Sequence, residues 1–481
     1  MKKMLSVVVF SFLLSGCAAV DKAYFRKIAI DPTRDISETL ISAVDLYSWV
    51  QKMAWVSPDS KHICYVVQEG KQQYVVLNGK EGKRYDFVGQ TLVFSPDSQR
   101  LAYLASQGGK QFVVVDGREG KRYEFIGEKT LVFSPSSQRF AYGAKEDGQW
   151  FAVIDTEEQN KYDGLGPQMV FSANNKDFAY VVMEYDYAAG KEEWFVVLNG
   201  VEERRYDGIS TDTPRFSPDG KRMAYGAQKE EQWFMVIDGV EGKRYHAIGV
   251  PVFSPDNRRI AYKAAVMGER PADSWYRLMP EWFLVLDGKD HRKHDNIVPG
   301  TIVFSPDSRR YAYGAQKDFQ RFKISEGGKR DAAGTIDLNC FTIEGDEVIR
   351  KFIVQSGYMV IDGLIQKSYD GIGSNTVVFS PDNINIAYAS GEWTIWDLTY
   401  KWGIVVNSGE PTKRYDRIDC TPVFSSDSQH LAYVSGRLVI VDEKYGRMYD
   451  RILSNVVFDS PEAFHYLALK GADIYLIEEK I

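Results

Sequence analysis

One short pattern recurs ten times between Trp55 and the end of the 481-residue chain, and this repetition limits the possible folds more than any other feature. Each copy has an apolar run ending in an aromatic residue, a Ser-Pro-Asp type turn, an Ala-Tyr segment, an apolar run before Asp-Gly or Asn-Gly, and a segment close to Lys-Arg-Tyr-Asp. The aligned aromatic residues lie 34 to 75 residues apart and are Trp55, Phe94, Phe133, Phe171, Phe216, Phe253, Phe304, Phe379, Phe424 and Phe458. Such a chain folds as copies of one small unit packed on each other.

Alternation and turn residues predict four short strands in each copy. In the third run of the fifth copy, one strand face carries Trp233, Met235 and Ile237, and the other carries Phe234 and Val236. Both faces are apolar, as expected for a sheet covered on both sides. Pro and Asp favour a tight turn, and Gly supplies the positive φ of a hairpin. Four-stranded units of about 40 residues are typical of propeller blades, so we predict an all-β protein, a β-propeller of four-stranded antiparallel blades.

The number of copies predicts about ten blades. Nine copies are complete, and the tenth ends after its third strand. Residues 44–50 alternate acceptably and can supply the missing outer strand, which closes one ring and removes its free edges. Because propellers usually have four to eight blades, two smaller propellers in series remain the alternative. We assign the propeller to residues 41–481, with an insertion at about 316–356 in the seventh copy.

The N-terminal segment has the features of an export signal. Lys2 and Lys3 precede an apolar stretch at 4–14, which is shorter than the roughly 20 residues of a membrane-spanning helix. Residues 1–16 are therefore expected to be a signal peptide. Residues 17–40 are expected to be a tether, with a short helix within 35–41.

The four residues Leu14-Ser15-Gly16-Cys17 resemble the lipobox of bacterial lipoproteins. The resemblance implies that Cys17 carries fatty acyl chains such as palmitate and anchors the protein to a membrane. In the enterobacterial version of the rule, Ala18 at the next position favours the outer membrane, facing the periplasm. A plain secretory signal that happens to contain a cysteine is the alternative.

The turn motif carries a second resemblance, to the TolB-type, WD40-like propeller repeat. It covers nearly all of the chain after the signal, and its six full matches are Ser57-Pro58-Asp59, Ser95-Pro96-Asp97, Ser217-Pro218-Asp219, Ser254-Pro255-Asp256, Ser305-Pro306-Asp307 and Ser380-Pro381-Asp382. Three copies depart from it, at Ser134-Pro135-Ser136, Ser172-Ala173-Asn174 and Ser425-Ser426-Asp427. The resemblance implies a periplasmic interaction module, or a propeller fused to a hydrolase domain, for which no residues remain here.

Charge and motif content argue against several functions. A net charge of −7 offers no general attraction to nucleic acid. The motifs of serine hydrolases, zinc proteases and nucleotide-binding loops are missing. His291 and His294 fall on opposite faces of a strand and so are not expected to chelate one metal. Beyond Cys17 three cysteines remain, so they cannot all pair, and a bridge between Cys340 and Cys420 is left open. We predict no catalytic residue, metal or cofactor.

Basic pairs recur in the predicted fourth strands. They are Lys83-Arg84, Lys121-Arg122, Arg204-Arg205, Lys243-Arg244, Arg292-Lys293 and Lys413-Arg414. Protection of exposed strand edges by positive charge is the structural interpretation. Contact with an anionic partner is the functional alternative.

Four copies have an expanded loop between their second and third strands, and all four loops open on one side of the predicted ring. They carry the aromatic residues and arginine typical of interfaces. The predicted partner-binding residues are Tyr185, Tyr187, Trp275, Tyr276, Arg277, Phe319, Phe322, Trp393 and Trp396.

These observations predict a non-catalytic cell-envelope lipoprotein whose propeller binds a protein or a cell-surface polymer through the long-loop face. The alternatives are a polysaccharide-active enzyme with carboxylates in the central channel, and a structural part of a larger envelope assembly. The first of these requires several acidic residues at one end of the innermost strands. Those strands are instead largely apolar.

Overall fold

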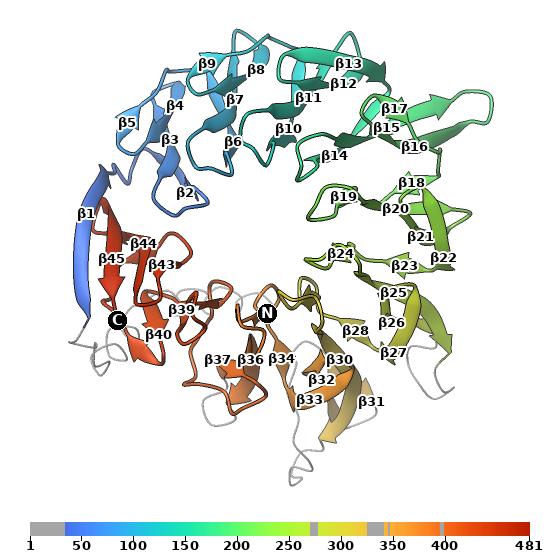
Figure 1. The fold of residues 1–481 in the computed structure, drawn as a ribbon, viewed down its shortest axis with the longest axis vertical. Coiled ribbons are helices and arrows are strands. Elements are labelled where there is room, and N and C mark those ends of the chain that lie inside the picture. Colours follow the sequence, from blue (N-terminus) through green and yellow to red (C-terminus); the bar gives the residue numbers. More distant parts are fainter. Residues whose placement is uncertain (1–33, 270–277, 325–340, 345–346, 395–398) are drawn as a thin grey trace, which may run out of the picture.

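The computed structural model describes residues 34–269, 278–324, 341–344, 347–394 and 399–481 (Figure 1). Within these ranges the regular elements are all β-strands, arranged as ten sheets side by side around a central axis. None of these residues forms a helix long and apolar enough to cross a membrane. The predicted all-β, ten-bladed propeller in one ring is confirmed, and the alternative of two propellers in series is wrong.

The first four blades each have a continuous innermost strand. Their strands are β2 (Trp49–Val56), β3 (Ile63–Glu69), β4 (Gln72–Leu77) and β5 (Lys80–Glu81); β6 (Phe87–Phe94), β7 (Leu101–Gln107), β8 (Lys110–Val115) and β9 (Arg118–Glu119); β10 (Phe125–Phe133), β11 (Phe140–Glu146), β12 (Gln149–Ile154) and β13 (Glu157–Tyr162); and β14 (Gly164–Phe171), β15 (Phe178–Asp186), β16 (Lys191–Leu198) and β17 (Val201–Glu202).

In blades five to seven the innermost strand is divided into two short pieces. The strands are β18 (Gly208–Ile209), β19 (Arg215–Phe216), β20 (Met223–Lys229), β21 (Gln232–Ile237) and β22 (Val240–Tyr245); β23 (Ala247–Ile248), β24 (Val252–Phe253), β25 (Ile260–Glu269), β26 (Leu278–Leu286) and β27 (Lys289–His294); and β28 (Asn296–Ile297), β29 (Val303–Phe304), β30 (Tyr311–Ile324), β31 (Phe341–Glu344), β32 (Glu347–Ile361) and β33 (Leu364–Tyr369).

The last three blades complete the ring. They contain β34 (Gly371–Ile372), β35 (Val378–Phe379), β36 (Ile386–Thr394) and β37 (Thr399–Val406); β38 (Val423–Phe424), β39 (Leu431–Ser435), β40 (Leu438–Val441) and β41 (Lys444–Tyr445); and β42 (Arg451–Ile452), β43 (Val457–Ser460), β44 (Ala463–Lys470), β45 (Asp473–Lys480) and β1 (Asp35–Ala43).

The hydrophobic core lies between neighbouring blades. Between blades two and three, Leu104 and Val113 from one sheet pack with Phe133 and Phe151 from the next. Each apolar strand therefore buries its two faces in two different clusters, as the double-faced alternation predicts. At roughly 1.5–3 kcal/mol for each large apolar side chain, this burial is the main stabilising contribution.

Every junction except that between the last and first blades also buries a pair of polar rings. The tyrosine that ends a fourth strand meets the tyrosine of the second strand in the next blade, as in Tyr123 and Tyr142, whose ring centroids are 6.4 Å apart. Burial raises the pKa of Tyr142 to about 12, so the pair stays neutral. Where the first and last blades meet, Ser42 replaces the tyrosine, and its Oγ lies 3.0 Å from the hydroxyl of Tyr65.

The Ser-Pro-Asp turns have the hydrogen bonds expected of turn chemistry. In blade two, Ser95 Oγ donates to Asp97 Oδ1 at 2.5 Å, and the same carboxylate oxygen accepts the Gln99 amide at 3.0 Å. These bonds, first that from Ser95, lower the pKa of Asp97. The Asp97 amide then donates to Ser137 Oγ in the next blade at 3.0 Å. The turns thus form a belt of hydrogen bonds from blade to blade.

An arginine strengthens the same junction. Arg100 Nε donates to Asp116 Oδ2 within its blade at 2.8 Å, and Nη1 donates to the carbonyl of Ser137 in the next blade at 2.9 Å. The guanidinium also lies 5.1 Å from the ring centroid of Phe133. This arrangement links a turn, its hairpin and the neighbouring blade.

Between blades four and five the belt is formed by different hydrogen bonds. Gly220 occupies the place of the accepting serine or asparagine and has no side chain, and Asn174 replaces the aspartate. Asn174 Nδ2 donates instead to the carbonyls of Asp219 and Gly220, at 3.3 and 3.1 Å. A Cβ at Gly220 would lie 2.8–2.9 Å from Asn174 atoms. The two departures from the motif therefore fit each other.

The ring is closed by β1, which pairs antiparallel with β45 from Asp35 opposite Lys480 to Ala43 opposite Asp473 (Figure 1). The expectations that residues 44–50 close the ring and that residues 35–41 form a helix are both wrong. Fourth strands here are mostly exposed and polar, as in β13 and β33, and β1 has this character. The ring therefore starts before the predicted boundary at residue 41.

A buried ion pair holds the closing strand. Arg34 Nη1 lies 3.0 Å from Glu479 Oε2, and the two side chains are 2% and 0% exposed. Arg34 Nη2 also donates to the carbonyl of Lys444 in blade nine at 2.6 Å. Removing one member of such a pair costs about 3–5 kcal/mol, because a charge is left buried without its partner. The start of β1 is thereby tied to both of the last two blades.

The match between Asn174 and Gly220 predicts non-additive mutational effects. Asn174→Asp removes two donated hydrogen bonds and should lower the free energy of unfolding by about 1–2 kcal/mol, and Gly220→Ser should destabilise through the close approach. The double variant restores the pairing of the other junctions and should be more stable than the sum of the single changes by about 1 kcal/mol. Urea unfolding of the four proteins measures this coupling. Additive effects would contradict the pairing.

Candidate functional site

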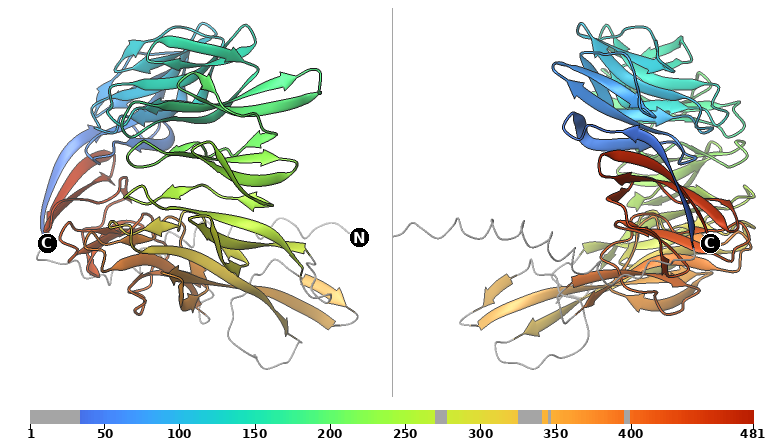
Figure 2. Two further views of the ribbon diagram at one scale, coloured as in Figure 1. Left: turned by 45° about the vertical axis from the view of Figure 1, so that its right-hand side comes forward. Right: turned by 90° about the vertical axis from the view of Figure 1, so that its left-hand side faces the viewer.

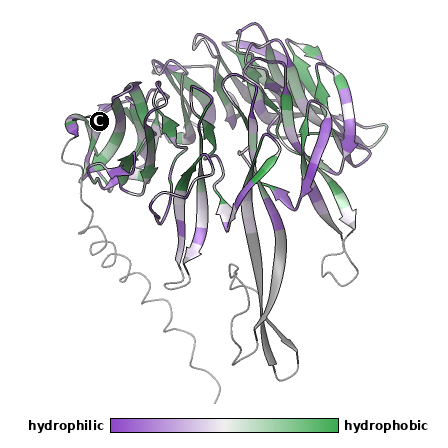
Figure 3. Cartoon of the chain, turned by 60° about the horizontal axis from the view of Figure 1, so that its bottom comes forward, coloured by the Kyte–Doolittle hydropathy of each residue, from purple (hydrophilic) through white to green (hydrophobic). Residues whose placement is uncertain are grey.

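The two sides of the ring differ in the length of their connections. We call the side where second and third strands join the hairpin face, and the side with the Ser-Pro-Asp turns the turn face. Four hairpins are elongated at the hairpin face: β15–β16, β25–β26, β30–β32 and β36–β37. Figure 3 shows long hairpins projecting from one side of the ring. In blade seven the predicted insertion at 316–356 extends β30 and β32 and adds β31 (Figure 2).

Exposed aromatic side chains gather on the hairpin face. Of the large hydrophobic side chains that the structure describes as exposed, six are aromatic, and each belongs to a hairpin or to the start of an innermost strand at this face. They are Tyr47, Phe87, Phe125, Tyr185, Tyr187 and Trp393. Exposed hydrophobic residues at the turns of the opposite face are aliphatic, namely Val201, Val240, Leu364 and Ile384. The two faces therefore present different chemistry to a partner.

The hairpin of blade four holds two of these tyrosines. The rings of Tyr185 and Tyr187 meet edge to face with centroids 4.9 Å apart, and Tyr187 is 84% exposed. The Tyr185 amide donates to Asp163 Oδ2 at 2.9 Å. Asp163 belongs to the segment equivalent to Lys-Arg-Tyr-Asp, so the final Asp of that motif anchors the hairpin that follows it. Sequence reasoning missed this role, although the repeated Asp was its signal.

The hairpin of blade eight forms a row of three aromatic rings. Tyr400 lies between Trp393 and Trp402, with centroids 5.4 and 5.2 Å away. The tyrosine packs over Gly371 and Gly391, where an added Cβ would come within 2.3 Å of its hydroxyl oxygen. Burial raises the pKa of Tyr400. The exposed indole of Trp393 therefore packs on one side against Tyr400, which is itself held tightly by its neighbours.

The structure does not describe the side chains of the other predicted binding residues. Phe319 and Phe322 belong to β30, but their side chains lie outside the described residues. Trp275, Tyr276, Arg277 and Trp396 also lie outside the described residues, as do Cys17 and Cys340.

Cys64 and Cys420 are free thiols in the described part of the chain. Their burial raises the pKa of both, to about 11 for Cys420.

The basic pairs of the fourth strands contact acidic residues of the ring. Lys121 Nζ lies 2.5 Å from Glu158 of the next blade, and Arg204 Nη1 lies 3.5 Å from Glu241 of the next blade. Arg84 pairs with Glu69 at 2.7 Å. Each exposed pair contributes about 1 kcal/mol or less, but their positive charge is balanced within the ring. This balance favours the structural interpretation over contact with an anionic partner.

His294 is a packing residue between blades. It is buried at the place of the fourth-strand tyrosine, with Nδ1 2.7 Å from the hydroxyl of Tyr358 and Nε2 3.1 Å from that of Tyr313. His291 instead meets the ring of Tyr311. Among the described residues, no three His, Cys, Asp or Glu side chains are grouped to hold a metal ion.

Comparison with known proteins shows similarity in fold alone. The chain matches no protein-family model and none of the curated proteins. A eukaryotic initiation factor structure is 10% identical, with 78% of this chain and 91% of that chain covered and a TM-score of 0.46. TolB from Acinetobacter baumannii is 14% identical, with 61% and 74% covered and a TM-score of 0.26. An oligogalacturonate lyase in complex with manganese is 10% identical, with 73% and 96% covered and a TM-score of 0.31. Likeness at this level assigns no function.

The burial of His294 predicts a pH-dependent contribution to stability. Burial lowers its pKa to about 4, so the unfolded chain binds a proton at this residue between about pH 6.5 and 4 while the folded chain does not. The free energy of unfolding should therefore fall as the pH drops through this range, by up to about 1.4 kcal/mol per pH unit from this group.

The double variant His294→Tyr with Tyr358→Phe introduces the Tyr and Phe that most other blades have at these positions. It should lose this part of the slope in urea unfolding measured from pH 4 to pH 7. Tyr358→Phe alone retains His294 and serves as the control. An unchanged slope in the double variant would contradict the assignment.

Proposed function

We propose that the protein is a lipid-anchored envelope protein whose propeller is a non-catalytic scaffold, and that a partner protein docks on the hairpin face. The observation that carries the proposal is that all the exposed aromatic side chains among the described residues gather on this face. Tyrosine and tryptophan are enriched among residues that dominate binding energy at interfaces. The turn face differs, because the Ser-Pro-Asp groups of adjacent blades hydrogen-bond to each other there.

The hairpin face is also pre-organised for binding. Asp163 holds the backbone of the blade-four hairpin, and Asp370 accepts the Trp393 amide at 2.8 Å in blade eight. Aromatic side chains on fixed hairpins lose little conformational freedom when a partner docks. The same face carries the four elongated hairpins, which increase the area available for contact. A cell-surface polymer is the alternative occupant.

The chemistry of the inner wall supports a non-catalytic role. Hydrolysis of a glycosidic bond usually requires two carboxyl groups about 5–10 Å apart across the scissile bond. The described lining of the two cavities formed by innermost-strand segments contains one carboxylate in each, Asp212 in the larger and Asp419 in the smaller. Asp419 is in addition paired with Arg417.

The point where the chain enters the ring suggests an orientation. Asp35 pairs with Lys480 at the end of β45, and this end lies at the turn face. The 17 residue-to-residue steps from Cys17 to Arg34 span at most roughly 56 Å. A lipid on Cys17 would therefore hold the turn face toward the membrane and leave the hairpin face free. The signal-like sequence and the TolB-like turn motif support an envelope location.

Docking on the hairpin face predicts that its exposed aromatics are needed for binding. The triple variant Tyr185→Ser, Tyr187→Ser and Trp393→Ser should recover at least about tenfold less partner from cell-envelope extracts than the unchanged protein. The matched control removes three exposed aliphatic residues from the turn face, with Val240→Ser, Leu364→Ser and Ile384→Ser, and should recover the same amount. Equal recovery by both variants would rule out the hairpin face.

The lipid anchor predicts a separate chemical result. Cells expressing the full chain with radiolabelled palmitate should label the protein, and Cys17→Ser should abolish the label and release the protein from the membrane fraction. One acyl chain binds only marginally, whereas two or three anchor firmly. Cys64→Ser is the control and should leave labelling unchanged. Persistent label on the Cys17→Ser protein would refute the anchor.

A further inference from the structure

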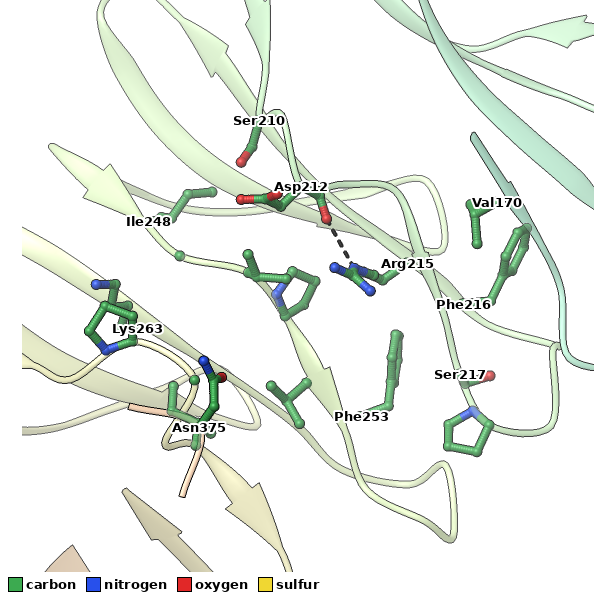
Figure 4. Close-up of a pocket in the computed structure, with 18 of the residues that line it drawn as sticks. Val170, Ser210, Asp212, Arg215, Phe216, Ser217, Ile248, Phe253, Lys263 and Asn375 are labelled. Atoms are coloured by element: carbon green, nitrogen blue, oxygen red, sulfur yellow. Dashed lines mark hydrogen bonds between the residues drawn. The ribbon is translucent and has the colours of Figure 1, made fainter. Parts of the chain in front are cut away.

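A cavity of about 880 Å³ opens on the inner wall of the ring beside the innermost strands of blades four to seven. This size lies within the usual range of ligand sites. Figure 4 shows its polar side chains, which come from different strands and loops and are Ser210, Asp212, Arg215, Ser217, Lys263 and Asn375. Most of the remaining wall is made of proline, valine, isoleucine and phenylalanine side chains. The cavity combines an apolar surface with a few charged groups.

Arg215 breaks the internal repeat at this cavity. It precedes the aligned aromatic of the fifth copy, where every other copy has a small or branched apolar residue. Those residues are Ala54, Val93, Val132, Val170, Val252, Val303, Val378, Val423 and Val457. Arg215 is exposed, and its Nε donates to the backbone carbonyl of Asp212 at 3.0 Å. Among the described residues it forms this hydrogen bond and no ion pair.

Lys263 breaks the repeat in the next blade. It follows the tyrosine of the second strand, where every other copy has an apolar residue or glycine. Those residues are Val66, Leu104, Gly143, Val181, Gly226, Gly314, Ala389, Val434 and Leu467. Lys263 is half-buried, its Nζ donates to the carbonyl of Ile297 at 3.4 Å, and the amine lies 4.4 Å from the ring centroid of Trp282. It too lacks an ion pair among the residues that the structure describes.

The other nine copies of the repeat show which residues these two positions need for folding. Nine copies show that neither position needs a cation for folding, and a half-buried amine without an acid partner costs stability. Both cations nevertheless line one cavity, where Asp212 is the single carboxylate in the described lining. The lining thus has an excess of positive charge within a chain whose net charge is −7. Burial lowers the pKa of Lys263, a shift that a bound anion would oppose.

A third polar group reaches the cavity because of a glycine. Gly300 has a φ of +69°, and an added Cβ there would lie 1.8 Å from Asn375 Oδ1. Any larger residue at 300 would displace this amide. The Asn375 amide can donate hydrogen bonds to an acidic group.

We propose that this cavity binds an organic anion, with its carboxylate or phosphate groups at Arg215 and Lys263 and its apolar part against the proline and valine wall. An inorganic ion would leave most of the cavity unfilled. Because the two cations belong to blades five and six, the ligand spans the junction between them. The site is separate from the hairpin face and does not depend on a partner docking there.

The experiment uses 8-anilinonaphthalene-1-sulfonate, an organic anion that fluoresces on binding, with the mature full-length protein. Titration should give a saturable site that phenylbutyrate, phenyl phosphate or both displace and that neutral benzyl alcohol does not. Displacement by one acid alone identifies carboxylate or phosphate as the recognised group. Displacement by benzyl alcohol as effective as by the acids would overturn the proposal.

The repeat itself supplies variants that should fold. Arg215→Val and Lys263→Gly place the residues of neighbouring blades at these positions, and each should weaken binding about tenfold, as expected for loss of a charged hydrogen bond. Lys221→Val is the matched control, because it removes one positive charge from the turn face, where the lysine side chain is 78% exposed. Unchanged affinity in the double variant Arg215→Val with Lys263→Gly, or an equal loss in Lys221→Val, would overturn the proposal. Urea unfolding midpoints confirm that each variant is folded.

Discussion

Contact between neighbouring blades is the constraint on which the whole structure depends. A blade with two apolar faces cannot bury either of them alone, so each sheet is stable only between two others. The junction adds directional contacts to this packing. The Asp97 amide reaches Ser137, Arg100 reaches the next backbone, and Tyr123 meets Tyr142. These contacts set the angle between blades, whereas apolar packing by itself leaves that angle less well defined.

The junction between the last and first blades makes equivalent contacts with different residues. Ser42 bonds to Tyr65 where other junctions use two rings, and Glu38 accepts a hydrogen bond from Tyr449 at 3.0 Å, as Glu158 does from Tyr123. Burial raises the pKa of Glu38, but hydrogen bonds from Lys470, Arg447 and Tyr449 outweigh this effect and lower it to about 2. The closing strand therefore repeats the contacts of an ordinary fourth strand. A ring without this strand would leave β45 as a free edge.

In this protein, which is built from one repeated unit, departures from the repeat are of three kinds. Some departures compensate each other, as Asn174 does for Gly220 and as Tyr358 does for His294, where an extra hydroxyl satisfies the imidazole. Others have no acidic partner within the described residues, as with Arg215 and Lys263 in the inner cavity, whose charged groups contact only backbone carbonyls and an aromatic ring. The elongated hairpins are a third kind of departure, because they add surface without altering the junctions. We locate the binding of a small anion at the uncompensated departures and the docking of a partner at the elongated hairpins.

The sequence alone determined the blade, the number of copies and the side of the ring from which the long hairpins project, because alternation, turn residues and strand order are local properties. It did not identify the closing strand. Residues 44–50 alternate acceptably, but a fourth strand needs one partner edge rather than an apolar face, and the polar β1 provides that edge. Arg100 was overlooked because its partners come from a hairpin and from the next blade.

Only the tertiary structure brought Asn174 into contact with Gly220 and placed Arg215 and Lys263 in the lining of one cavity. The members of each pair are separated by 45 residues or more along the chain. The printed sequence shows which positions break the repeat, but the contact between blades decides which of those breaks are satisfied. That contact depends on the rotation from one blade to the next, and no local pattern encodes this rotation. The arrangement of the ring therefore distinguishes compensated departures from sites that remain free to bind.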